Sequence, residues 1–241
     1  MGILLKAQDA NFSNYIAVAE YPIINALKNL YYIRGNAEIS VADHSGNGNN
    51  GTVTGTVAFE QNYATFNGAP ASSAIILPNA MNVGAHIAGI VAYKATGDRM
   101  LLGELSPSTA SAGKGFNFAS NKLYYAIEGG AGTQILNFSV TKNANFNIVA
   151  FRISETTIKV YQFTGGVLVE IASQSISNGI IRNDTANRTI YVGGNYYNFG
   201  DQGSVSIACA SYYEGIVTNE QLNGACSFVK TYMDIIGLSV N

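Results

Sequence analysis

DHSGNGNNGTVTGT, residues 43–56, is the stretch of this chain whose interpretation decides the fold. It contains the pattern G-x-G-x-x-G at Gly46, Gly48 and Gly51, which in a dinucleotide-binding fold leads from a strand into a helix. Here the pattern is followed by TVTGTVAFE, residues 52–60, which alternates as a strand does. A pyrophosphate needs a helix N-terminus at this point, so the stretch is not a nucleotide-binding loop.

A calcium loop of the EF-hand type is the second interpretation to test. The stretch begins suitably with Asp43, but position twelve is Thr54, where a bidentate glutamate is required. Its oxygen ligands would be Asp43, Asn47 and Asn49, which include one carboxylate, whereas useful calcium affinity needs more than one. We therefore predict no metal at this turn.

Backbone chemistry explains the same residues. The Asp43 side chain can accept hydrogen bonds from the amides that follow it, and glycine and asparagine adopt positive φ angles. We predict a structural turn made by Asp43, Gly46, Asn47, Gly48 and Gly51.

Beyond the turn, short runs alternate apolar and polar residues and are separated by glycine or asparagine. These runs are residues 63–68, 86–94, 115–120, 122–130, 146–154, 157–163, 167–173, 189–194 and 205–213. Strands joined by tight turns, with no helical pattern between them, predict an all-β antiparallel sandwich or barrel and exclude a parallel α/β fold.

Two segments have the helical period instead. Residues 21–32 follow this period after Pro22. Residues 218–236 begin with Thr218 three positions before Gln221, which is the spacing of a capping box. We expect the second helix to cover one edge or end of the sandwich.

Composition limits the classes of function. The 241 residues suit one all-β domain, and 13 basic against 15 acidic residues give a net charge of -2 with no basic run. Nucleic acid is therefore not an expected partner. No apolar stretch approaches the roughly 18 residues of a membrane span, and the first residues do not form a signal peptide. We expect a chain made in the cytoplasm without export, or one from which a signal was removed, and no membrane partner.

Metal and cofactor sites are also not expected. Two cysteines, two histidines and no Cys-x-x-Cys do not make a zinc cluster, and we predict no cofactor. Cys209 and Cys226 are expected to be two buried thiols, with a disulfide between them as the alternative.

Motifs in the same order resemble those of the concanavalin A-like jelly rolls, in their laminin-G-like branch. Residues 41–55 resemble the branch's opening turn, D-x-S-G-N-G-N-x-G-T, and residues 64–78 resemble its strand pair F-N-G … I-x-L-P. The pair formed by residues 189–195 and 205–222 is similar to its closing I-G-G … L-T-x-x-Q segment. The resemblance spans residues 37–235 and implies a two-sheet antiparallel jelly-roll sandwich with a C-terminal helix.

The chain departs from this branch at two places. The usual tryptophan-histidine pair is replaced by NANFNIVAF, residues 143–151, and the hairpin aspartate is replaced by Thr164 before Gly165 and Gly166. The fold tolerates both changes, but the resemblance no longer supports a sugar or metal role at these positions.

The beginning of the chain differs from the remainder. We predict that residues 1–36 form an extension, a possible attachment segment that docks to the sandwich or to another chain, and that residues 37–241 form the jelly roll. LLKAQDANFSNYIAV, residues 4–18, is similar to a lead-in found ahead of jelly rolls in phage and prophage tail, fibre and head-decoration proteins. This likeness implies a location in a virion, with an extracellular location as the alternative.

Catalysis is the least favoured function. Related jelly rolls that hydrolyse β-glucans carry carboxylates on alternate residues of one strand, which projects them into one cleft. No strand predicted here has that pattern. Glu128 and Glu170 could each face a concave sheet, but we expect both to be solvated, and we predict that the protein is not an enzyme.

Binding is favoured instead, at a long loop within GGNYYNFGDQG, residues 193–203. Tyrosine rings and amide groups suit sugars, although the chain has no tryptophan. The loop could equally pack on a neighbouring subunit. The candidate ligand-binding residues are Asn195, Tyr196, Tyr197, Asn198 and Asp201.

These observations lead to a prediction with alternatives. We predict a non-catalytic phage or prophage virion protein that acts in adhesion or attachment by binding a glycan or host cell-surface receptor. The alternative is an architectural component of the virion, such as a decoration, fibre or baseplate protein, that contacts other virion subunits or further copies of itself. A polysaccharide-cleaving enzyme ranks last.

Overall fold

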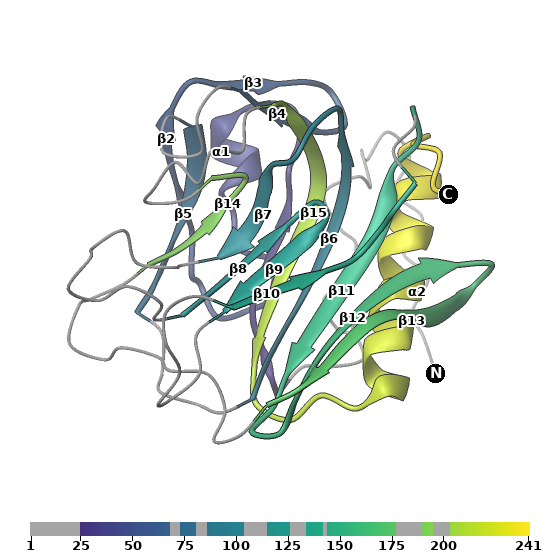
Figure 1. Ribbon diagram of the computed structural model, residues 1–241. Coiled ribbons are helices and arrows are strands. Elements are labelled where there is room, and N and C mark those ends of the chain that lie inside the picture. Colours follow the sequence, from purple (N-terminus) through teal and green to yellow (C-terminus); the bar gives the residue numbers. More distant parts are fainter. Residues whose placement is uncertain are drawn as a thin grey trace, which may run out of the picture.

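The protein is a two-sheet antiparallel jelly-roll sandwich with a helix on the outer face of one sheet (Figure 1). This confirms the predicted all-β class. The computed structural model describes residues 25–67, 73–80, 86–103, 115–125, 134–141, 144–176, 189–194 and 203–241.

Sheet A has the strand order β13-β12-β11-β6-β15-β4-β3, and β1 also pairs with β15. The last strand of the chain is therefore central in this sheet. The strands of sheet A are β1 Leu27–Tyr32, β3 Val57–Phe59, β4 Ala64–Phe66, β6 Ile87–Ala95, β11 Asn147–Ile153, β12 Thr157–Thr164, β13 Val167–Ser175 and β15 Val205–Glu214.

Sheet B has the order β10-β9-β8-β7-β14-β5-β2. Its strands are β2 Thr52–Gly55, β5 Ser73–Ala80, β7 Met100–Gly103, β8 Phe116–Ala119, β9 Lys122–Tyr125, β10 Gln134–Asn137 and β14 Thr189–Val192. The described residues also form two helices, α1 Ala37–Ser40 and α2 Asn219–Ile235.

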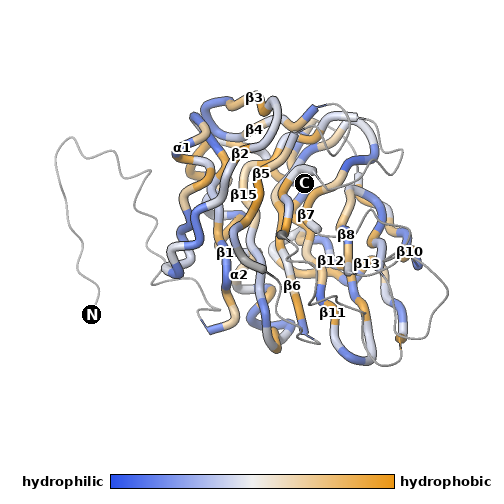
Figure 2. The backbone as a smooth tube through the Cα atoms, turned by 90° about the vertical axis from the view of Figure 1, so that its left-hand side faces the viewer, coloured by the Kyte–Doolittle hydropathy of each residue, from blue (hydrophilic) through white to orange (hydrophobic). Residues whose placement is uncertain are grey.

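The central strands β6, β11 and β15 of sheet A are buried on both faces. Along β11, Val149 and Phe151 point into the core between the sheets, whereas Ile148 and Ala150 pack in a second core beneath α2. Since side chains alternate between the faces of a strand, burial on both faces requires nearly continuous apolar runs. The hydrophobic residues accordingly concentrate along the strands (Figure 2).

The helix α2 supplies the other side of this second core. Leu222, Cys226, Val229 and Met233 form its buried stripe. Thr218 accepts a hydrogen bond from the backbone N–H of Gln221, and the Gln221 side chain accepts one from the backbone N–H of Thr218. The predicted capping box is confirmed, and the helix covers a face of sheet A rather than an edge or end.

Loss of this cap should be measurable. Thr218→Ala is expected to lower the free energy of unfolding by about 1 kcal/mol, because the N–H of Gln221 loses its acceptor. Thr231→Ala, in the exposed last turns of the same helix, should change stability by a few tenths of a kcal/mol at most. Urea unfolding of both variants tests this, and equal losses would contradict the capping assignment.

The helix predicted over residues 21–32 is wrong where the structure describes it. Leu27–Tyr32 is the strand β1, and it pairs antiparallel with β15, with Leu30 opposite Ser211. Leu30 packs under α2 and Tyr31 packs between the sheets, so the strand is apolar on both faces. Such a run satisfies a helical pattern by coincidence, and only its pairing partner identifies it as a strand.

This strand also changes the domain boundary. It lies inside residues 1–36, which we predicted to be an extension, yet it is an integral strand of sheet A. The attachment segment therefore remains a prediction only for residues 1–24, which lie outside the described residues. The two cysteines are buried free thiols, as predicted.

Candidate functional site

The predicted ligand-binding residues cannot be compared with the structure. Asn195, Tyr196, Tyr197, Asn198 and Asp201 all lie outside the described residues, as does Glu128. Their role remains a prediction.

The two ends of that loop are described, and a buried arginine holds one of them. Arg99 is 0% exposed, and its Nε donates to the carbonyl of Gly193 at 3.2 Å. Its Nη2 donates to the Ser73 hydroxyl at 2.9 Å, while its backbone N–H donates to the Ser120 hydroxyl at 3.2 Å. Arg99 thus ties the end of β14 to the start of β5.

Hydrogen bonds within the chain hold the turn at residues 43–51. Oδ1 of Asp43 accepts the backbone N–H of Ser45 at 2.9 Å and that of Leu30 at 3.0 Å. Oδ2 accepts the backbone N–H of Asn49 at 2.9 Å and the Ser45 hydroxyl at 2.7 Å. One carboxylate therefore accepts hydrogen bonds from three backbone amides.

Other residues of the turn bind the same strand. Nδ2 of Asn47 donates to the carbonyl of Leu27 at 2.8 Å, and Nδ2 of Asn49 donates to that of Lys28 at 2.9 Å. The Tyr31 hydroxyl donates to the carbonyl of Asn49. The turn therefore supplies partners to backbone groups that an edge strand otherwise leaves unpaired. Sequence reasoning missed this partner because it assigned β1 to a helix.

The glycines of the turn act in two ways. Gly46 and Gly48 have φ angles of +87° and +71°, which side chains disfavour. Gly51 instead lies close to β5, where an added Cβ would be 2.9 Å from Cγ2 of Ile75 and 3.0 Å from the carbonyl oxygen of Ile76. Positive φ was predicted for the turn, but this close approach was not.

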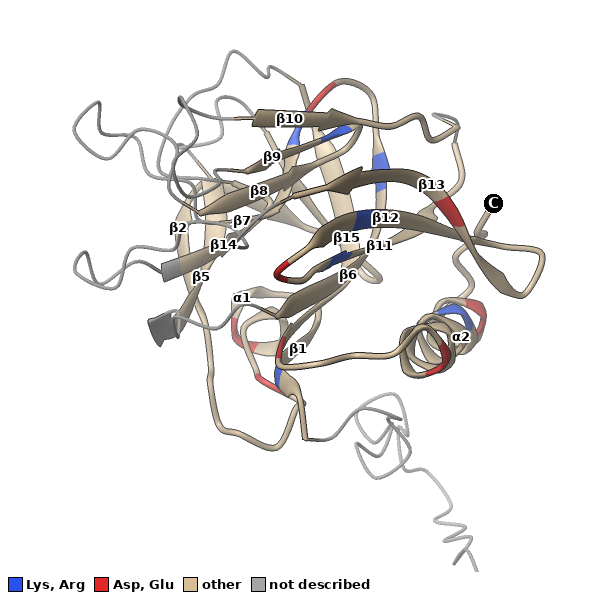
Figure 3. Cartoon of the chain, turned by 60° about the horizontal axis from the view of Figure 1, so that its bottom comes forward, with Lys and Arg blue, Asp and Glu red and all other residues tan. Residues whose placement is uncertain are grey.

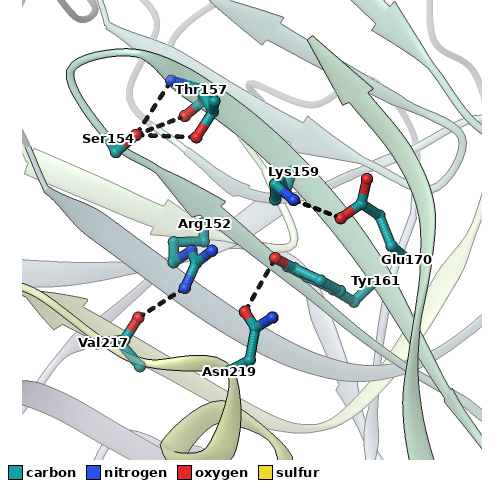
Figure 4. Close-up of polar contacts among 8 residues, drawn as sticks. All are labelled: Arg152, Ser154, Thr157, Lys159, Tyr161, Glu170, Val217 and Asn219. Atoms are coloured by element: carbon teal, nitrogen blue, oxygen red, sulfur yellow. Dashed lines mark hydrogen bonds and ion pairs between the residues drawn. The ribbon is translucent and has the colours of Figure 1, made fainter. Parts of the chain in front are cut away.

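Glu170 lies in a row of polar side chains on the outer face of sheet A, beside the start of α2 (Figure 4). Its Oε2 is 2.7 Å from Nζ of Lys159, and this hydrogen bond lowers the pKa of the Glu170 carboxyl. A lowered pKa is the opposite of what a general acid requires. Nearby, Arg152 donates to the carbonyl of Val217, and Tyr161 donates to Asn219.

A groove lies between the β12–β13 turn, α2 and the last residue of the chain. Its volume is about 330 Å³, and its lining comprises Phe163, Thr164, Gly165, Gly166, Ser227, Lys230 and Asn241. Figure 3 shows that the turn between β12 and β13 lies on the same side of the molecule as α2 and the C-terminus. The lining thus combines hydroxyls, an amide and an ammonium group around Phe163, which is 4% exposed.

The Lys230 ammonium in this lining has a carboxylate partner. Nζ of Lys230 is 2.6 Å from Oδ1 and 2.7 Å from Oδ2 of Asp234, one turn further along α2. The Ser227 hydroxyl donates its proton to the carbonyl of Asn223 at 3.0 Å, so its oxygen can still accept a hydrogen bond from a ligand. The groove therefore presents hydrogen-bond donors and acceptors without a large net charge.

Two further features concern metal ions and membranes in the described part of the chain. There, no three His, Cys, Asp or Glu side chains are grouped closely enough to hold a metal ion together. No helix among the described residues has the length and apolar character needed to span a membrane.

The comparisons with known proteins rest on structure. No protein-family model matches the sequence, and no curated protein matches it. One similar structure is domain 4 of AbnA, an extracellular GH43 arabinanase from Geobacillus stearothermophilus, which was solved in complex with arabinotriose. The TM-score is 0.54 and the sequence identity is 18%, and the match covers 83% of this chain and 98% of that one.

Receptor-binding domains of clostridial toxins are similar as well. That of botulinum neurotoxin D has a TM-score of 0.60 and 15% identity, over 89% of this chain and 54% of that one. The same serotype's domain in complex with N-acetylneuraminic acid has a TM-score of 0.57 and 13% identity, over 92% of this chain and 53% of that one. This chain spans about half the length of those toxin domains. At these identities the likeness shows the shared β-sandwich fold.

Proposed function

We propose that this protein is a non-catalytic domain that binds glycans. The observation that carries the proposal is the groove beside the β12–β13 turn, because it lies on a β-sandwich and is lined by hydroxyl, amide and ammonium groups. Groups of these kinds form hydrogen bonds with the hydroxyls of sugars. The similar AbnA domain was solved with arabinotriose, which supports a sugar as the ligand class.

The polar row at Glu170 supports the non-catalytic part of the proposal. Glycoside hydrolysis needs one carboxylic acid that is protonated at working pH and a second carboxylate nearby. The Glu170 carboxylate is bound to the Lys159 ammonium, and its pKa is lowered by that bond. It is therefore unsuited to donating a proton to a leaving group.

We expect the purified protein to bind at least one glycan on a broad array, and the same glycan to bind saturably in isothermal titration calorimetry. We also expect it to release no reducing sugar from that glycan. Failure to bind any glycan or host cell would refute the proposal. Reducing-sugar release that disappears in Glu170→Gln would identify an enzyme instead.

The setting in a phage or prophage particle, as an attachment or an architectural protein, remains the prediction made from residues 4–18. Tail or capsid genes on both sides of the coding sequence would support it. Whether the loop at residues 195–201 also contacts a ligand is a separate question, which array binding by Tyr196→Ala and Tyr197→Ala can answer.

A further inference from the structure

The groove beside the β12–β13 turn is small. Its volume of about 330 Å³ is at the lower end of the range for ligand pockets, which extends from about 300 to 1,000 Å³. A site of this size suits one sugar residue rather than an extended polysaccharide. The ligand would therefore be bound by a terminal or branching residue, with the rest of the glycan in solvent.

The charges of the groove limit the chemistry of that residue. The positive charge of Lys230 is balanced by Asp234, whose two oxygens are 2.6 and 2.7 Å from Nζ. An anionic sugar would have to displace or approach this carboxylate, since the ammonium group is already paired. A neutral sugar meets no such opposition.

The Lys230–Asp234 ion pair can form hydrogen bonds with two hydroxyls of one sugar. An ammonium group has three N–H donors and a carboxylate has about four lone-pair sites, so each retains capacity after they bond each other. Two hydroxyls on adjacent ring carbons can accept from the ammonium and donate to the carboxylate. Both groups are reachable, because the side chains of Lys230 and Asp234 are 35% and 56% exposed.

Two glycines lie in the opposite wall of the groove. Gly165 and Gly166 have φ angles of +59° and +82°, and an added Cβ at either would meet nothing within 4 Å. The turn therefore has no side chain at these two positions, which leaves its backbone accessible to a ligand.

We infer that the groove binds one neutral sugar residue through a vicinal pair of hydroxyls, held by the lining residue Lys230 and by Asp234, which is bonded to Lys230 at the edge of the lining. The inference rests on the glycan-binding function proposed above. It assigns the recognition to α2 and the β12–β13 turn rather than to the loop at residues 195–201.

The chain offers a matched control for this inference. Lys159 and Glu170 form another ion pair on the outer face of sheet A, with atoms 2.7 Å apart and side chains 29% and 37% exposed. Neither residue lines the groove, whereas Lys230 does. Replacing Lys159 therefore removes a comparable surface ion pair without touching the proposed site.

The test titrates methyl glycosides of mannose, galactose, glucose and arabinose, and N-acetylneuraminic acid, into the whole protein while backbone amide signals are followed by NMR. We expect a neutral glycoside to shift the signals of Gly165 and Gly166. Lys230→Met and Asp234→Asn should each weaken that binding about tenfold or more, whereas Lys159→Met should leave the Kd within about twofold. Melting temperatures of the three variants should match that of the parent.

The outcomes separate the inference from the function on which it rests. If a glycan binds and both groove variants keep the parental Kd, the inference is wrong and the glycan-binding function stands. Tighter binding of N-acetylneuraminic acid than of every neutral glycoside would also overturn it. If no sugar or array glycan binds the parent protein, the proposed function fails and the inference fails with it.

Discussion

Arg99→Met is expected to lower the free energy of unfolding by about 3 to 5 kcal/mol. The guanidinium group is fully buried, and its removal strands the carbonyl of Gly193 and removes a donor from the Ser73 hydroxyl. Each unsatisfied buried polar group costs about 1 to 3 kcal/mol, and methionine does not fill the same volume. Chemical denaturation followed by tyrosine fluorescence or circular dichroism measures the loss.

The control for this variant is Arg152→Met. The Arg152 side chain is half-buried and donates to the carbonyl of Val217, so the same substitution there should cost about 1 kcal/mol. If the two variants lost equal stability, the burial of Arg99 would not be the cause of its effect.

Asp43→Ala should have the next largest effect, a loss of about 2 to 4 kcal/mol. The carboxylate accepts the backbone N–H groups of Leu30, Ser45 and Asn49, and alanine accepts none of them. Since Leu30 lies on β1, the change also releases the turn from that strand. Thermal and urea unfolding measure the loss, and hydrogen exchange at the Leu30 amide should become faster.

Asp43→Asn separates the charge from the geometry. Asparagine keeps one acceptor oxygen, so it should retain about half of the stability that alanine loses. Glycan binding should persist in both variants below their melting temperatures. Loss of binding at an unchanged melting temperature would contradict the structural assignment of the turn and make it a ligand site.

Local patterns were sufficient for much of the fold. The alternation in residues 157–163 predicts β12 because side-chain period is a property of the strand itself. The short apolar run at residues 146–154, bounded by polar residues, predicts β11 in the same local way. The spacing of Thr218 and Gln221 predicts the start of α2 because a capping box is complete within four residues. The same reason explains why the role of Asp43 was predicted, since an Asx turn forms with its own neighbours.

Features that depend on distant partners were not predictable in this way. Nothing within residues 27–32 distinguishes a doubly buried strand from an apolar helix, because the distinction rests on β15, almost 180 residues later. Arg99 appears in the sequence as an ordinary surface charge, and only the packing of β5 and β14 around it shows its burial. The groove was missed because its lining comes from the β12–β13 turn, α2 and Asn241.

The sequence by itself determined the all-β class, the positions of most strands, the cap of the last helix and the structural nature of the turn at residues 43–51. Each of these depends on backbone preferences and side-chain periodicity over a few residues. The tertiary structure alone decided that β1 belongs to sheet A, that the turn pairs with it and that α2 covers a sheet face beside a groove. These depend on which surfaces meet when apolar faces are buried, and local sequence does not encode the partner.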